Sequence, residues 1–110
     1  MAVQIDFVGA SGVTYRYAAR DGQRLSPSGG NYIFAREAPD GGMAVVYVGE
    51  AENLAALADE RWTEAQTHFG ATHAFVRLNV AASVRRQERQ DLIGAYAPPM
   101  NLADDASAAG

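Results

Sequence analysis

Glu88 is the side chain in this sequence whose surroundings most require a chemical partner. It falls in a segment, residues 81–96, where apolar residues recur at the spacing of an amphipathic helix. The apolar positions on the same stripe are Val84, Leu92 and Ala95. A buried carboxylate without a partner is costly, so a stripe that faces a core must supply one. The predicted partner is either a metal ion or an arginine such as Arg77 or Arg85.

Other reactive side chains point to fewer kinds of chemistry. The chain has no cysteine, which excludes disulfides, thiol catalysis and zinc–thiolate sites. His68 and His73 are five residues apart, across the predicted end of a helix and start of a strand, which is not a recognised ligand spacing. Arg85, Arg86 and Arg89 form a cluster of cations that could contact a phosphate backbone or form a solvated helix face.

The charge balance disfavours a nucleic-acid partner. The chain has nine arginines, no lysine and 13 acidic residues, which gives a formal net charge of -4. Affinity for nucleic acid depends largely on cations that replace the counterions of phosphate. The segment 44–70 carries the single cation Arg61 beside the acidic residues Glu50, Glu52, Asp59, Glu60 and Glu64. A helix of that charge repels phosphate, so a protein partner is the alternative.

Nothing in the sequence predicts contact with a membrane. No run of eighteen apolar residues is present, so no membrane-spanning helix is expected. The first seven residues lack both the basic start and the apolar stretch of a signal peptide. Together with the absence of cysteine, these features predict a cytoplasmic protein.

Alternation of apolar and polar residues predicts two β-hairpins in the first half of the chain. Their strands are expected over residues 3–8, 13–17, 31–35 and 44–48. The last strand is almost wholly apolar, as is typical of a strand covered on both faces. The second half predicts a helix, a strand and a helix, over residues 54–66, 72–79 and 81–96. Asn53 is the predicted N-cap of the first helix, Gly70 ends that helix, and the proline pair 98–99 ends the second.

This order of elements predicts an α+β fold. We expect a small antiparallel sheet with two main helices packed on it, preceded by an N-terminal β-hairpin. A single domain is expected, with the hairpin and a loop in residues 1–27 and the main body in residues 28–101. Residues 102–110 consist mostly of alanine, aspartate and serine and predict a disordered tail.

Several short motifs occur in the order and spacing of a known family. Residues 30–34 read Gly-Asn-Tyr-Ile-Phe, residues 47–49 read Tyr-Val-Gly, and residues 98–101 read Pro-Pro-Met-Asn. Between them lie Trp62 and a Gly-Ala-Thr-His stretch at residues 70–73. Together these motifs resemble the GIY-YIG nuclease superfamily, in particular small bacterial members of it, over most of the chain.

The resemblance implies hydrolysis of DNA phosphodiester bonds with the help of Mg²⁺. It assigns the two signature tyrosines, Tyr32 and Tyr47, to activating or positioning water. The family's arginine, which stabilises phosphate charge, would fall at Leu57. Arg61, one helical turn further along, is the catalytic candidate for that role.

The family's metal-binding glutamate is also displaced. Its position, three residues before the leucine of a Leu-Ile pair, is Arg89 in this chain. The neighbouring Glu88 is therefore the candidate metal ligand. An oxygen ligand of this kind suits a hard divalent ion such as Mg²⁺.

Two functions follow from this incomplete catalytic set. In the first, the chain is a GIY-YIG-like domain that has lost nuclease chemistry and serves as a binding or regulatory module with no firmly bound cofactor. Its tyrosines then pack in the sheet, and Glu88 forms a structural salt bridge. In the second, it is a weak or rearranged Mg²⁺-dependent endonuclease that uses Tyr32, Tyr47, Arg61 and Glu88.

Overall fold

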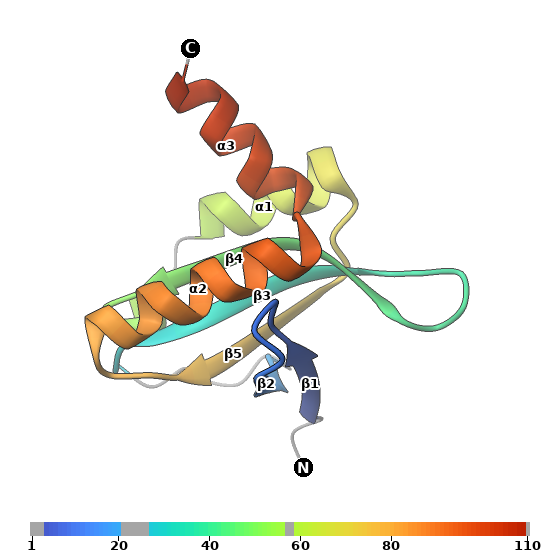
Figure 1. The fold of residues 1–110 in the computed structure, drawn as a ribbon. Coiled ribbons are helices and arrows are strands. Elements are labelled where there is room, and N and C mark those ends of the chain that lie inside the picture. The colour runs from blue at the N-terminus through green and yellow to red at the C-terminus, as the bar shows by residue number, and fades with distance from the viewer. Residues whose placement is uncertain (1–3, 21–26, 57–58, 110) are drawn as a thin grey trace.

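A five-stranded antiparallel sheet forms the centre of the computed structural model (Figure 1), which describes residues 4–20, 27–56 and 59–109. The strands are β1 (Gln4–Val8), β2 (Thr14–Ala19), β3 (Gly30–Glu37), β4 (Met43–Ala51) and β5 (His73–Leu78). Their spatial order is β1-β2-β5-β3-β4, so β5 lies between the two hairpins. The predicted α+β fold, with an antiparallel sheet and an N-terminal hairpin, is confirmed.

The helices cover both faces of the sheet. They are η1 (Leu54–Ala56), a single 3₁₀ turn, α1 (Asp59–Phe69), α2 (Ala82–Tyr96) and α3 (Pro99–Ala109). Leu92 of α2 belongs to the core on one face, whereas Ala65 of α1 and Met100 of α3 belong to the core on the other. Within the described residues, no helix has both the length and the apolar character needed to cross a membrane.

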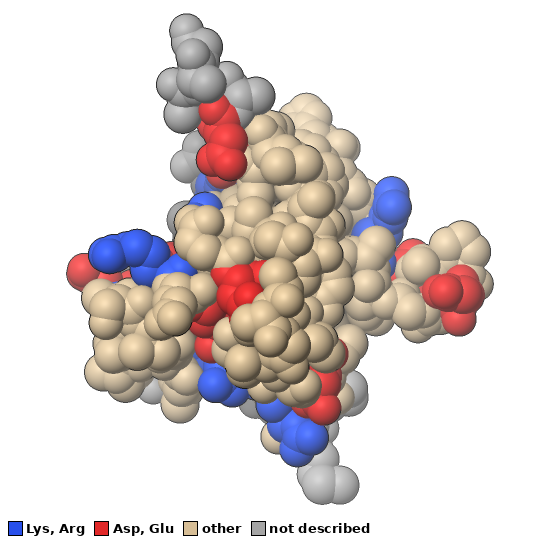
Figure 2. Space-filling view, in the orientation of Figure 1, with Lys and Arg blue, Asp and Glu red and all other residues tan. Residues whose placement is uncertain are grey.

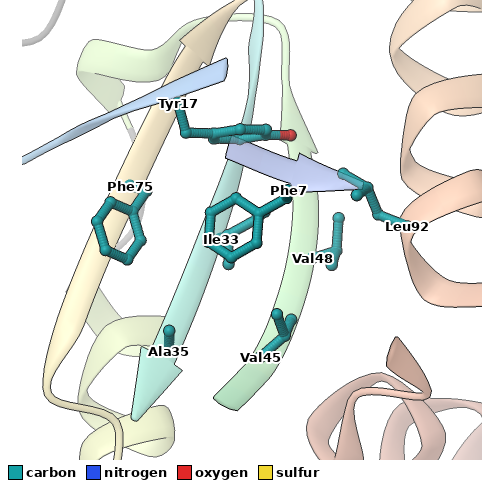
Figure 3. Packing of buried hydrophobic residues seen from close by; sticks show 8 residues of the cluster. All are labelled: Phe7, Tyr17, Ile33, Ala35, Val45, Val48, Phe75 and Leu92. Carbon is teal, nitrogen blue, oxygen red and sulfur yellow. The ribbon is translucent and has the colours of Figure 1, made fainter. Parts of the chain in front are cut away.

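Alternation along β3 divides the apolar residues between these two cores. Ile33 and Ala35 face α2, and Tyr32 and Phe34 face α1 and α3, as the period of two in a strand requires. The core beneath α2, shown in Figure 3, contains Phe7, Tyr17, Ile33, Ala35, Val45, Val48, Phe75 and Leu92. The aromatic ring of Phe7 meets both Tyr17 and Phe75 edge to face. The N-terminal hairpin therefore shares its core with the main body.

The turn of the N-terminal hairpin also lies against α2. The backbone N–H of Ala10 donates to the carbonyl of Asp91 over 3.1 Å. Figure 1 shows the hairpin beside the helix although the two are far apart in the sequence. On the same face of the molecule, acidic side chains gather near the middle of the view in Figure 2.

The segment after β4 differs from the single helix predicted over residues 54–66. It forms the short turn η1 first and α1 only from Asp59. The Asn53 side chain caps η1 by accepting a hydrogen bond from the backbone N–H of Ala55 over 3.0 Å. Gly70 follows α1 with a φ of 70°, a conformation that favours glycine, so the predicted stop is confirmed.

The prediction of a disordered tail from residue 102 is wrong for the residues that the structure describes, because α3 continues to Ala109. Pro99 is the first residue of α3, a position where its fixed φ suits a helix and its missing N–H is not needed. Met100 and Asn101 are buried and fasten this first turn, and alanine-rich sequence favours continuation of the helix. A proline pair that ends α2 thus also begins α3.

Asn101 attaches α3 to the outer edge of the sheet. Its side-chain amide donates to the carbonyl of Val48 over 2.9 Å and accepts from the N–H of Val48 over 2.8 Å. The amide thereby takes the place of a neighbouring strand along β4, and Asn101 is 1% exposed. This contact holds α3 beside Tyr47, the residue that precedes Val48 on β4.

Candidate functional site

Tyr32 and Tyr47 lie next to each other on the face covered by α1 and α3. Their ring centroids are 5.8 Å apart, and the residues are only 7% and 9% exposed. Tyr32 is paired with Gly49 across the two strands, and a Cβ at Gly49 would lie 2.2 Å from the tyrosine ring. The glycine of the Tyr-Val-Gly motif is therefore needed for the close approach of Tyr32.

Arg61 reaches the same place from α1. Its guanidinium carbon is 4.9 Å from the centroid of the Tyr47 ring, a cation–π contact. Its Nη2 donates to Oδ2 of Asp104 on α3 over 2.7 Å, and its Nη1 lies 3.4 Å from Oε1 of Glu64. The structure thus brings Tyr32, Tyr47 and Arg61 together, with the arginine already paired to carboxylates. The family's own arginine position, Leu57, lies outside the described residues.

The surroundings of Tyr32 disfavour its ionised form. Burial raises the pKa of Tyr32 well above its ordinary range, and the adjacent Tyr47 raises that pKa further. The guanidinium groups of Arg61 and Arg89 offset only part of this effect. Arg89 stands where the resemblance expects the metal-binding glutamate, so a cation influences Tyr32 from that position.

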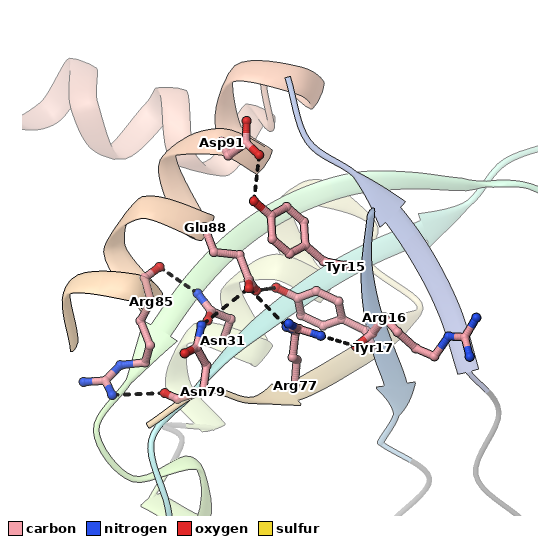
Figure 4. Close-up of polar contacts among 9 residues, drawn as sticks. All are labelled: Tyr15, Arg16, Tyr17, Asn31, Arg77, Asn79, Arg85, Glu88 and Asp91. Carbon is pink, nitrogen blue, oxygen red and sulfur yellow. Dashed lines mark hydrogen bonds and ion pairs between the residues drawn. The ribbon is translucent and has the colours of Figure 1, made fainter. Parts of the chain in front are cut away.

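Glu88 is buried on the other face of the sheet, beneath α2, and is 3% exposed. The Tyr17 hydroxyl donates to its Oε2 over 2.7 Å, and Nε of Arg77 donates to its Oε1 over 3.1 Å (Figure 4). The amide of Asn79 adds a longer contact of 3.4 Å to Oε1. Of the two kinds of partner predicted for Glu88, the structure contains the arginine, and that arginine is Arg77.

The sheet separates Glu88 from the two tyrosines. Its partner Tyr17 belongs to the core beneath α2, whereas Tyr32 and Tyr47 belong to the core beneath α1 and α3. Around Glu88 the groups are a cation and neutral donors, which do not fit the oxygen ligands that Mg²⁺ requires. In the described part of the chain, no group of three or more histidine, aspartate or glutamate side chains is arranged to hold a metal ion.

No protein-family model, curated protein or solved structure matches this chain. The resemblance to GIY-YIG nucleases therefore stays a prediction that depends on the short motifs of residues 28–101.

The buried face of α2 differs from the predicted stripe. It consists of Arg85, Glu88 and Leu92, while Val84 is 49% exposed and Ala95 is exposed as well. Nη1 of Arg85 donates to the carbonyl oxygens of Val80 and Asn79, over 2.6 and 3.1 Å. Arginine is usually a surface residue, so hydropathy alone places Val84 inside. The carbonyls that accept from Arg85 become available only in the folded chain.

Asn31 and Asn79 extend the polar network of Glu88 and were not singled out from the sequence. Asn31 is fully buried, donates to the carbonyl of Arg85 over 3.0 Å and accepts from the amide of Asn79 over 3.0 Å. These contacts link β3 and α2 to Asn79, the residue that follows β5, as Figure 4 shows. The sequence contains little signal for either residue, because Asn31 begins and Asn79 ends a predicted strand. Only the burial of their polar groups in the folded chain requires partners.

Asp91 connects the turn of the N-terminal hairpin to α2 and was likewise missed. It accepts from the N–H and the hydroxyl of Ser11, over 2.8 and 2.7 Å, and from the Tyr15 hydroxyl over 2.7 Å. Burial and this hydrogen bond raise the pKa of Tyr15 to about 12. The same contacts, from Ser11 first and then Tyr15, lower the pKa of Asp91 below its ordinary value of 3.8.

We expect the free energy of unfolding of Asp91→Asn to depend less on pH in the acidic range than that of the original protein. The folded pKa of Asp91 is depressed, so its ionised form stabilises the fold above pH 3.8, and this contribution is lost as the pH falls through the folded pKa. Urea unfolding at several pH values between about 2 and 6 measures the effect. Asp105→Asn, at an exposed position of α3, is the control for removal of one surface carboxylate. Parallel curves for Asp91→Asn and the original protein would contradict the prediction.

Proposed function

We propose that this protein is a GIY-YIG-like domain that serves as a non-catalytic binding or regulatory module for a protein partner. The observation that carries the proposal is the position of Glu88. Its carboxylate accepts from Tyr17 and Arg77 beneath α2, on the opposite face of the sheet from Tyr32 and Tyr47. The candidate metal ligand and the candidate water-positioning groups therefore do not share a site.

The charges near the tyrosines support the same proposal. Arg61 is paired with Asp104 and Glu64, so its charge is largely neutralised before any phosphate arrives. Arg89 brings a cation where the family carries a carboxylate. Loss of a group that stabilises transition-state charge lowers a rate by about a hundredfold or more. Nuclease chemistry in this arrangement would lack both its phosphate clamp and its metal ligand.

The alternative function is a weak or rearranged Mg²⁺-dependent endonuclease that cleaves DNA. One observation favours it, namely that Tyr32, Tyr47 and Arg61 converge on one face of the sheet. Because Glu88 lies on the opposite face of the sheet, this alternative requires either another carboxylate to bind the metal ion or a rearrangement that moves Glu88.

A plasmid-nicking assay distinguishes the two functions. The protein is incubated with supercoiled plasmid and Mg²⁺ or Mn²⁺, beside Tyr47→Phe and Glu88→Ala, with the fold of each variant verified by circular dichroism. We expect no nicking above a protein-free control. Nicking that falls about tenfold or more in folded Tyr47→Phe, as loss of a catalytic group does, would establish the endonuclease. Nicking that survives both substitutions would indicate a contaminant or another site.

A further inference from the structure

A groove with a volume of about 630 Å³ runs between the turn of the N-terminal hairpin and α2. The hairpin contributes Ser11 and Val13 to its lining, and α2 contributes Val84, Gln87 and Asp91. None of these residues belongs to the tyrosine site on the opposite face. The groove is therefore separate from the tyrosine site.

Two valines form apolar walls of the groove. Val13 and Val84 are each 49% exposed, although valine is usually buried. They come from separate elements, the hairpin and α2, and both line the groove. An aliphatic chain that enters the groove would cover both side chains and be stabilised by their burial.

Among the described residues that line the groove, one carboxylate has no cationic partner. Glu88 and Asp91 both line it, one helical turn apart, and Arg77 is paired with Glu88. Asp91 has three hydrogen bonds from neutral donors, and in the part of the chain that the structure describes it forms no ion pair. The groove therefore carries a net negative charge, consistent with the acidic side chains at the middle of Figure 2.

Two amides complete the lining. Gln87 and Gln90 are exposed on α2 and line the groove beside Asp91. Their side-chain oxygens are acceptors that can receive the remaining N–H groups of a cation bound at the carboxylate. Aliphatic walls with acceptors and an unpaired negative charge match the side chain of arginine or lysine, which combines an apolar stem with a cationic end.

We propose that this groove binds a basic side chain, arginine or lysine, presented by a segment of a partner protein. The chain's net charge of -4 also favours a cationic partner. This inference rests on the proposed function, because it specifies the chemistry of the partner that a binding module would recognise. It concerns the face of α2 and the hairpin, so the tyrosine site is not involved.

Titration with a short peptide tests the proposal. The probe is acetyl-Gly-Ser-Arg-Gly-Ser-amide, followed through backbone amide NMR shifts, and the same peptide with neutral citrulline in place of arginine is its control. We expect shifts at Ser11, Val84 and Gln87 with the arginine peptide. The citrulline peptide should bind about fivefold more weakly, since one charge pair is lost. Salt should weaken the binding.

Two variants with the same substitution locate the site. Gln87→Arg adds a cation inside the groove and should weaken binding about fivefold, whereas Gln66→Arg, at an exposed position of α1, should not change it. Both positions are exposed, so both variants should fold. Equal binding of the two peptides, shifts outside the groove, or equal effects of the two variants would each overturn the proposal. The nicking assay tests the proposed function separately. If neither nicking nor peptide binding is observed, the proposal for the groove is rejected, but the proposed non-catalytic function is not.

Discussion

Glu88→Ala is expected to lower the free energy of unfolding by about 3 kcal/mol, the range seen when one partner of a buried ion pair is removed. The substitution leaves the Tyr17 hydroxyl without its acceptor and Arg77 without its carboxylate, at a position that is 3% exposed. Because the Arg77 side chain is 36% exposed, water can hydrate its charge in part, which keeps the loss below the largest values. The energetic role of Glu88 is therefore expected to be structural.

Urea unfolding, monitored by circular dichroism, measures this loss. The control is Asp6→Ala, which removes an ion pair with Arg16 between side chains that are 44% and 64% exposed. An exposed ion pair contributes little to stability, so the loss for Asp6→Ala should be clearly smaller than the loss for Glu88→Ala. Equal losses would contradict the structural role of Glu88. A rise in the unfolding midpoint with Mg²⁺, which Glu88→Ala abolished, would instead identify Glu88 as a metal ligand.

Asn101→Ala is expected to lower the free energy of unfolding by about 2–6 kcal/mol. The side-chain amide satisfies both backbone groups of Val48, a residue of the edge strand that is fully buried. Alanine can satisfy neither group, and each unsatisfied buried group costs about 1–3 kcal/mol. The same substitution should loosen α3, whose Asp104 pairs with Arg61.

Hydrogen exchange and urea unfolding together examine this prediction. The backbone amide of Val48 should exchange faster in Asn101→Ala, since its acceptor is the Asn101 oxygen. Leu102→Ala is the matched control, because the neighbouring Leu102 is 50% exposed on the same helix. Surface substitutions usually change stability by less than about 0.5 kcal/mol. An unchanged exchange rate at Val48 would show that α3 is held by other contacts.

Regularities of short range were sufficient to predict most elements. The strand alternation around Phe7 and Tyr17, the capping residue Asn53 and the terminator Gly70 each describe a few consecutive residues, and the structure contains the corresponding hairpin, turn and helix end. Periods of two and 3.6 residues are properties of the backbone itself. For this reason, the sequence was sufficient to predict the order of hairpins, helix, strand and helix. The α+β class follows from that order.

Contacts between distant residues were outside the reach of such patterns. The place of β5 between the two hairpins depends on pairing across the sheet, and α3 depends on burial of Met100 and Asn101 against β4. The buried state of Arg85 likewise depends on carbonyl oxygens that the fold places within reach. Each is a tertiary property with no local period.

Glu88 shows most clearly which properties follow from local sequence and which follow from tertiary structure. The sequence placed Glu88 on one face of the helix with Leu92, and both are buried, although Val84 and Ala95 of the same predicted stripe are exposed. This placement was enough to require a partner for the carboxylate and to limit that partner to a metal ion or an arginine. The choice of Arg77, together with Tyr17, arises because β2 and β5 pair beneath α2, which brings both donors to one carboxylate. The need for a partner follows from burial, which a local pattern can predict. Which groups satisfy it depends on how strands far apart in the sequence are assembled.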